Sequence, residues 1–233
     1  MGRGWVHGIR EASASKKGKL FTKIAKEISV AVRTGGSKDP NANSRLRLAL
    51  REAQKASMPK DTVDRAIKRG SGESAEGQLE EVLYEAYGAN GVPVLVEALT
   101  DNRNRTVQDL RAIFVRGGGA LGAEGSVAWN FDRVGAILAK DSKGRDAEEA
   151  AINAGADNVE ALEDGLFQFI CALGDLETVQ EALIKEGWEV STSELIYKAK
   201  TPVTITPEQE VMLEKLNESL DDHDDVKRVH FAL

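Results

Sequence analysis

Basic side chains recur near the start of the sequence at the spacing of one helix face. One row has intervals of three, four and three residues and consists of Lys16, Lys19, Lys23 and Lys26. A second row has intervals of four and consists of Arg47, Arg51 and Lys55. Because an α-helix has about 3.6 residues per turn, each row would lie along one side of a helix. Rigidly held ammonium and guanidinium groups can bind the phosphates of a polyanion and displace its counterions.

The charge of the chain is unevenly distributed. Residues 1–75 contain 9 Lys and 8 Arg against 7 Asp and Glu, which gives a net charge of +10, whereas the whole chain has −7. The remaining residues therefore carry −17. Such asymmetry favours a polyanionic partner for residues 1–75. A basic surface that serves only solubility is the alternative, but three consecutive helices with few acidic residues on that face favour binding.

Further candidates for a phosphate or base contact lie around these rows. Trp5 stands among cationic residues, where its ring could stack on a base or could anchor the terminus on the helices. The other basic candidates are Arg3, Arg10, Lys17, Lys68 and Arg69.

A second polar cluster is expected where a strand meets a helix, in the segment 100–106. The N-terminus of a helix offers unpaired N–H groups to an anion, and Arg103 and Arg105 would add positive charge there. An ordinary cap by Asn102 or Asn104 with exposed arginines is the alternative. Two arginines oppose the helix dipole at this end, which favours the anion site.

The sequence lacks the residue constellations that enzymes use. Its three histidines are far apart, and no cluster of Cys and His has the spacing of metal ligands. The glycine-rich segment 117–122 formally matches the dinucleotide fingerprint, but a helix is predicted before it and a strand after it, which reverses the required order. The acidic segment 221–225 could attract a divalent cation weakly, and a solvated turn is the preferred interpretation. We therefore expect no catalytic residue, metal, cofactor or small-molecule substrate.

Three predicted helices position the basic rows. The first, at 16–32, has an apolar stripe opposite its lysines, formed by Phe21, Ile24, Ile28 and Val32. The second spans 44–56, and the third spans 58–70 with a proline in its first turn. These three helices predict a small bundle with its basic residues on the outside. The small polar segment 71–77 is predicted to be a flexible linker.

Beyond this linker the apolar pattern indicates strands alternating with helices. Strands are predicted at 82–87, 92–99 and 126–131, with a helix at 104–116. Residues 134–199 then follow the β-α-β-β-α-β order of a ferredoxin-like domain. A last helix at 206–220 and a strand at 226–231 would complete the first sheet. The predicted fold class is α+β with three domains: a basic helical domain (1–75), a middle α/β-sandwich domain (76–133 plus 201–233) and an inserted ferredoxin-like α/β-sandwich domain (134–200).

The sequence also predicts the cellular compartment. No apolar run approaches the roughly 20 residues that span a bilayer, and the N-terminus has no apolar signal core. The one cysteine, Cys171, fits a reducing compartment and is expected to be buried in an apolar run. We expect a cytoplasmic protein without a membrane partner.

Several short motifs occur in order along nearly the whole chain. They are KLFTK at 19–23, DPN at 39–41, NSRL at 43–46, MPKD at 58–61, AIKRG at 66–70, YEAYG at 84–88, LTDNRNRT at 99–106 and GSV at 125–127. Together they resemble the YebC/PmpR family. This resemblance implies a helical domain followed by two α+β domains. The family's usual opening, Gly-His-Ser-Lys-Trp, is matched well at Trp5 only, and the basic tract after it is shorter here.

The resemblance also implies a function. Members of that family are described as probable transcriptional regulators that bind DNA, their relatives include a mitochondrial translational activator, and a role at the ribosome is proposed for bacterial members. Together with the basic rows, this leads to the hypothesis of a non-enzymatic, nucleic-acid-binding regulator of gene expression. A DNA-binding transcriptional regulator is the leading version, and a translation factor that binds ribosomal RNA at the ribosome is the alternative.

Overall fold

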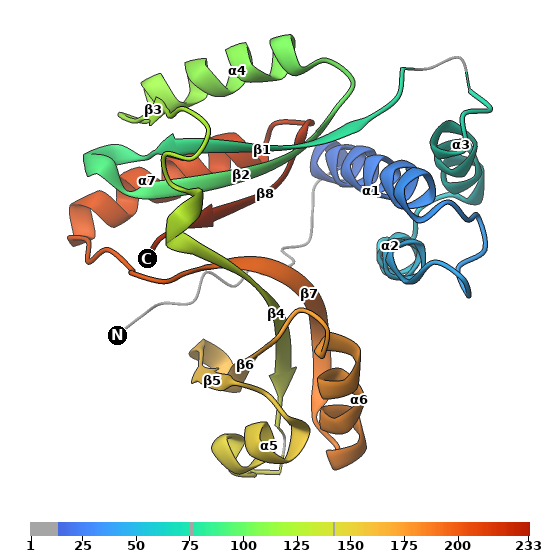
Figure 1. Ribbon diagram of the computed structural model, residues 1–233, viewed down its shortest axis with the longest axis vertical. Coiled ribbons are helices and arrows are strands. Elements are labelled where there is room, and N and C mark those ends of the chain that lie inside the picture. The colour runs from blue at the N-terminus through green and yellow to red at the C-terminus, as the bar shows by residue number, and fades with distance from the viewer. Residues whose placement is uncertain (1–13, 75–76, 142) are drawn as a thin grey trace. The chain divides into compact units, whose positions relative to one another are not determined.

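The computed structural model describes residues 14–74, 77–141 and 143–233, and Figure 1 labels their helices and strands. They form two compact units. One unit consists of Trp129–Val203 with Ala232–Leu233, and the other consists of the described residues up to Ala128 together with Thr204–Phe231.

The first part of the chain is a bundle of three helices, as predicted. These are α1 (Ala14–Gly35), α2 (Ser44–Lys55) and α3 (Lys60–Gly70). The bundle core includes the fully buried Ile28 and Leu46 with Ala66 beside them. Helices α1 and α3 approach each other so closely at Gly70 and Ser29 that a Cβ at position 70 would overlap the carbonyl oxygen of Ser29. The hydroxyl of Ser29 donates to the carbonyl of Ala66 at 2.8 Å, which ties the same two helices together.

One buried amide organises the turn between α1 and α2. Asn43 caps α2, since its Oδ1 accepts a hydrogen bond from the N–H of Leu46 at 3.0 Å. Its Nδ2 donates to the carbonyl oxygens of Ala31 and Ser37 at 2.8 and 3.0 Å. Asn43 is buried, so these three hydrogen bonds replace its contacts with water.

The middle domain contains an antiparallel sheet with the strand order β3-β1-β2-β8. Its strands are β1 (Glu80–Tyr87), β2 (Pro93–Thr100), β3 (Ala120–Leu121) and β8 (Val226–Phe231). A short 3-10 turn, η1 (Ala89–Gly91), joins β1 to β2. Helices α4 (Arg103–Arg116) and α7 (Pro207–Asp221) lie beside the sheet. They contact each other where Gly117 lies against Leu216. The prediction that the last helix and strand complete this sheet is confirmed.

The strand predicted at 126–131 is wrong. Residues 126 and 127 form a bend, the 3-10 helix η2 (Ala128–Asn130) follows, and only Phe131 is in a strand, the first strand of the inserted domain; the third strand of this sheet is β3. The reason is Glu85, whose buried carboxylate accepts hydrogen bonds from the N–H groups of Gly125, Val127 and Ala128. A single side chain thus uses the backbone donors that a neighbouring strand would need.

The inserted domain has the predicted ferredoxin-like order. Its elements are β4 (Phe131–Lys140), α5 (Ala147–Ala154), β5 (Asn158–Ala161), η3 (Glu163–Gly165), β6 (Leu166–Cys171), α6 (Leu176–Glu186) and β7 (Glu189–Ala199). The antiparallel sheet has the order β5-β6-β4-β7. Phe169, Leu183 and Trp188 lie in its core together with Cys171, and burial raises the pKa of the Cys171 thiol.

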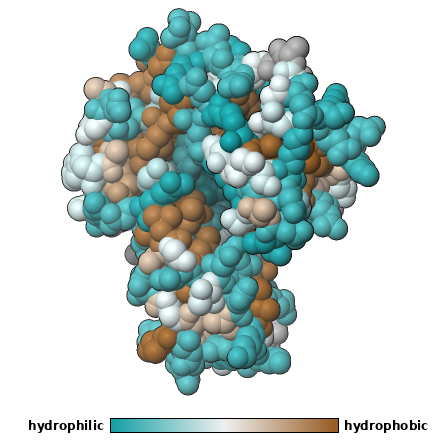
Figure 2. All heavy atoms as spheres, turned by 45° about the vertical axis from the view of Figure 1, so that its right-hand side comes forward, coloured by the Kyte–Doolittle hydropathy of each residue, from teal (hydrophilic) through white to brown (hydrophobic). Residues whose placement is uncertain are grey.

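The fold class is therefore α+β with three domains, the third inserted into the second. Figure 2 shows hydrophilic residues over most of the face that it presents, with hydrophobic residues in separate patches. Among the described helices, none has the length and apolarity that crossing a bilayer requires. The exact domain boundaries stay predictions.

We expect Asn43→Ala to lower the free energy of unfolding by about 2–4 kcal/mol, because it removes a cap and leaves buried carbonyl groups without donors. Asn102 is the matched control, since it caps α4 through one bond to the N–H of Arg105 and is exposed. Asn102→Ala should cost about 1 kcal/mol. Urea unfolding of both variants measures the difference, and equal decreases in stability would contradict the structural role assigned to Asn43.

Candidate nucleic-acid interface

The lysine row of α1 contacts the acidic turn between α7 and β8. Lys19 pairs with Asp222 at 3.1 Å and Lys23 with Asp221 at 3.0 Å. Lys26 forms an ion pair with Asp225 and donates to the backbone carbonyl of Asp224. We call residues 221–225 the acidic turn.

These ion pairs correct two expectations. The helical pattern of α1 predicts that Lys19, Lys23 and Lys26 face solvent. Their Nζ groups instead form ion pairs with carboxylates of the same molecule. The composition of 221–225 predicts a solvated turn, which holds for the exposed Asp221, Asp222 and Asp224 but not for Asp225, which is 3% exposed. The physical reason is the topology, because α7 and β8 return to the middle sheet and bring the turn against α1.

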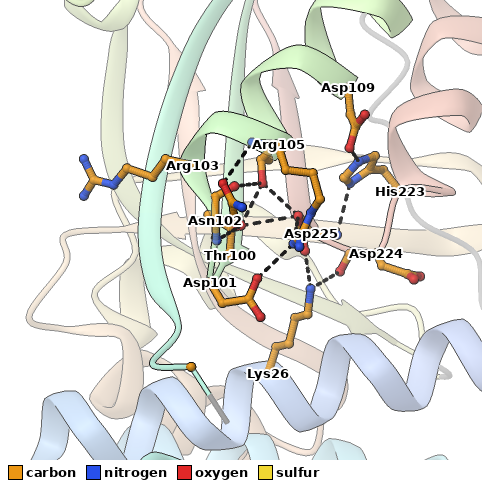
Figure 3. A network of polar contacts seen from close by, with 12 residues as sticks. Lys26, Thr100, Asp101, Asn102, Arg103, Arg105, Asp109, His223, Asp224 and Asp225 are labelled. Atoms are coloured by element: carbon orange, nitrogen blue, oxygen red, sulfur yellow. Dashed lines mark hydrogen bonds and ion pairs between the residues drawn. The ribbon is translucent and has the colours of Figure 1, made fainter.

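Asp225 is the centre of a polar network that joins α1, α4 and the acidic turn (Figure 3). Its Oδ2 accepts a hydrogen bond from the Thr106 hydroxyl at 2.8 Å and pairs with Arg105 at 3.0 Å, while its Oδ1 faces Lys26. Burial alone would raise the pKa of this carboxyl. The hydrogen bonds from Lys26, Thr106 and Arg105 outweigh burial and hold its pKa at about 2.

The arginines at the start of α4 also have carboxylate partners. Asn102 forms the cap, Arg103 pairs with Glu80, and Arg105 pairs with Asp101 at 3.0 Å as well as with Asp225. The hydrogen bonds to Asp225 and Asp101 raise the pKa of Arg105. The junction thus contains the ordinary Asn102 cap that the sequence analysis gave as the alternative, and both arginines form ion pairs with carboxylates. Anion binding at this junction stays a prediction.

A further ion network, which the sequence pattern did not predict, connects the bundle to the sheet. Glu27 of α1 contacts Arg45 of α2 at 2.8 Å and Lys227 of β8 at 3.2 Å. Arg45 in turn contacts Glu81 of β1 at 3.0 Å. Burial would raise the pKa of Glu27, but Lys227 and Arg45 together lower it. An acidic residue within the lysine-rich helix is the signal that could have indicated a buried partner.

Two more contacts fasten the bundle to the middle domain. Val30 of α1 packs with Leu79 and Leu99 in a buried apolar cluster. Arg69 at the end of α3 donates to the carbonyl of Gly77 and pairs with Asp101 at 3.2 Å. The helices before the segment 71–77 are therefore packed against the sheet that follows it, and the flexibility of the segment itself stays a prediction.

The basic row of α2 lies as the sequence predicted. Arg51 and Lys55 are exposed and Arg47 is partly exposed, while Leu46 and Ala49 are buried in the bundle. We call Arg47, Arg51 and Lys55 the α2 row. Lys68 of α3 is exposed, as is Lys17, whose ammonium group lies 5.9 Å from the centre of the Phe21 ring.

The remaining candidates cannot be placed in this way. Arg3, Trp5 and Arg10 lie outside the described residues, and the same holds for the side chain of Lys16.

An open cleft of about 530 Å³ lies beside the network and is lined by Lys19, Thr22, Lys26, Arg105, Asp109 and residues 222–225. At its edge His223 lies 3.3 Å from Asp109. Within the part of the chain that the structure describes, no group of three or more His, Cys, Asp or Glu residues is arranged to hold a metal ion. The lysines and arginine instead neutralise the acidic turn.

Fold and charge together define a class of protein, in which a basic three-helix domain is fixed by ion pairs to the first of two α+β domains. Residues 5–73 match the family model described as the TACO1/YebC protein N-terminal domain, and residues 79–233 match that of the TACO1/YebC second and third domain. The chain belongs to the TACO1/YebC family.

Similar proteins are found in several bacteria. The chain is 46% identical to a probable transcriptional regulatory protein of Bdellovibrio bacteriovorus, with full coverage of both chains. It is 45% identical to one of Pseudomonas fluorescens, over 100% of this chain and 99% of the relative. The crystal structure of a conserved hypothetical protein from Aquifex aeolicus has a TM-score of 0.87 at 37% identity, covering 98% of this chain and 95% of that one.

The network around Asp225 predicts a specific loss of stability in acid. Its folded pKa of about 2 lies below the ordinary value of 3.8, so the stabilisation is present above about pH 4 and disappears as the pH falls toward 2. Asp225→Asn should lower stability at pH 7. It should also reduce the fall in unfolding free energy between about pH 5 and pH 2.5 by about 1–2 kcal/mol, allowing for solvent screening.

Urea unfolding at both pH values measures this fall. Asp224→Asn is the control, since Asp224 is exposed and its side chain forms no ion pair among the described residues. Asp224→Asn should show the same decrease in unfolding free energy between the two pH values as the wild type. If Asp225→Asn also showed the wild-type decrease, the network would be contradicted.

Proposed function

We propose that this protein is a cytoplasmic regulator of gene expression that binds nucleic acid without catalysing a reaction, and that its partner is DNA. The family supports the regulatory role, since the relatives are named probable transcriptional regulatory proteins. The observation that carries the binding role is the α2 row. Its three cationic residues lie on the outer side of a helix whose inner side is held in the bundle core.

The chemistry of the α2 row suits a phosphate backbone. Positions four residues apart are separated by about 6 Å along a helix, so the three side chains form an extended line. Two of them are arginines, whose guanidinium groups can bind phosphate through two parallel hydrogen bonds. Such contacts position a protein on a nucleic acid and carry no direct sequence information. The α2 row therefore accounts for affinity and leaves sequence selection to other contacts.

A translation factor that binds ribosomal RNA, with the ribosome as its partner, is the second candidate. It is favoured by the same observation, because phosphate contacts are common to DNA and RNA. Parallel measurements on a DNA duplex and on a ribosomal RNA hairpin distinguish the two candidates by their relative affinity at one salt concentration.

We expect the triple variant Arg47→Ala, Arg51→Ala and Lys55→Ala to bind duplex DNA more weakly while it remains folded. The slope of log affinity against log salt should become shallower by about 0.9 for each phosphate that the variant no longer neutralises. Fluorescence anisotropy over a salt series measures both quantities. A matched variant, Lys140→Ala with Lys143→Ala and Lys185→Ala, removes the same charge from exposed positions of the inserted domain and should keep wild-type binding.

A packing variant distinguishes weaker phosphate binding from unfolding of the domain. Leu46 is fully buried, so Leu46→Ala should destabilise the bundle by about 2–5 kcal/mol. The triple variant of the α2 row should lower stability far less than Leu46→Ala, because it removes only surface contacts, each of which contributes about 0.2–1 kcal/mol. Equal binding by the α2 row variant and the matched variant would contradict the proposed interface.

A further inference from the structure

The three ion pairs between α1 and the acidic turn become progressively more exposed toward the start of α1. The side chains of Lys26 and Asp225 are 14% and 4% exposed. Those of Lys23 and Asp221 are 19% and 50% exposed, and those of Lys19 and Asp222 are 39% and 67% exposed. The inner pair is part of the buried network, whereas the carboxylates of the two outer pairs lie at the surface.

This difference in exposure separates fixed from exchangeable contacts. Breaking a buried pair leaves an uncompensated charge inside the protein, which is strongly unfavourable. An exposed pair contributes only about 0.2–1 kcal/mol and is weakened by salt. Lys19 can therefore leave its carboxylate without disturbing Lys26 or Asp225. Lys23 is 19% exposed and its ammonium group also donates to the backbone carbonyl of Asp221, so its release breaks a backbone contact of the turn as well.

The partners of Lys19 and Lys23 resemble the groups of a polyanion. Each ammonium group has an anionic oxygen at 3.0–3.1 Å, which is within the range of an ammonium contact to phosphate. Lys17, in the same part of the helix, is exposed. A phosphate backbone that reached this part of α1 would meet three lysines, two of them covered by Asp221 and Asp222.

We propose that Lys19 and Lys23 form a second contact surface for the nucleic acid, which the outer carboxylates of the acidic turn cover in the free protein. This inference rests on the proposed function, because it assigns the partner of the α2 row to a further surface. Asp221 and Asp222 compete with phosphate, and Lys26 with Asp225 keeps the turn in place. The competition lowers the affinity for any polyanion and favours partners that engage both surfaces together.

The test compares two doubly neutralised variants of the full chain. Asp221→Asn with Asp222→Asn removes the covering carboxylates. Glu218→Gln with Asp224→Asn removes the same charge from the same segment, at exposed side chains that form no ion pair with α1 among the described residues. Because two exposed pairs no longer compete with phosphate, the first variant should bind a DNA duplex roughly twofold to thirtyfold more tightly than the second. Unfolding midpoints verify that both remain folded.

Two further measurements make the result specific. Adding Lys19→Ala and Lys23→Ala to the first variant should remove its increase in affinity. In the wild type, titration with the duplex should shift the backbone amide NMR signals of residues 221–225, since the lysines leave their partners. Equal affinities of the two neutralised variants, or unchanged amide signals of the turn during saturating binding, would overturn the proposal.

The failure of the proposed function has a different signature. If the wild type and the two neutralised variants bind neither the duplex nor an RNA hairpin at low salt, both the proposed function and this inference are wrong. If the wild type binds and the α2 row variant does not, but the two neutralised variants behave alike, only the covered surface is wrong.

Discussion

The buried carboxylate of Asp225 is the interaction on which the arrangement of the basic residues depends. It receives Lys26 from α1 and both Arg105 and Thr106 from α4, so three distant segments meet at one charge. A carboxylate can be buried in this way only because donors surround it, and each donor is thereby held in a defined position. This anchor orients the acidic turn toward α1 and pairs Lys26 and Arg105 with a carboxylate of the same molecule.

Most of the fold was predictable because its elements are set by local patterns. The apolar stripe of α1 and the opposed faces of α2 indicate helices directly, and the β-α-β-β-α-β order of the inserted domain follows from the alternation of short elements. The strand expected at 126–131 failed because the carboxylate of Glu85, some forty residues away in sequence, takes the backbone donors of that segment. A polar residue at a buried strand position was the available sign of such a contact.

The candidate interface was predictable only in part, for a similar reason. A helical wheel places Arg47, Arg51 and Lys55 away from the buried face of Leu46, and the structure agrees, because Arg51 and Lys55 are exposed and Arg47 is partly exposed. The same reasoning for α1 identifies a lysine face but cannot show what covers it, since Lys23 and Asp221 are separated by 198 positions. The excess of positive charge in residues 1–75 is thus partly neutralised within the molecule, and the acidic character of the rest has a structural use.

The central claim is that nucleic acid contacts the helical domain and does so through α2. Ultraviolet crosslinking in living cells, followed by mass spectrometry of the peptides joined to nucleotide, tests it without assuming a target. Sequencing of the joined DNA and RNA in the same samples identifies the class of partner. The account predicts crosslinked peptides from Ser44–Lys55 and the neighbouring part of α1, whereas crosslinks confined to the inserted domain between Phe131 and Ala199 would contradict it.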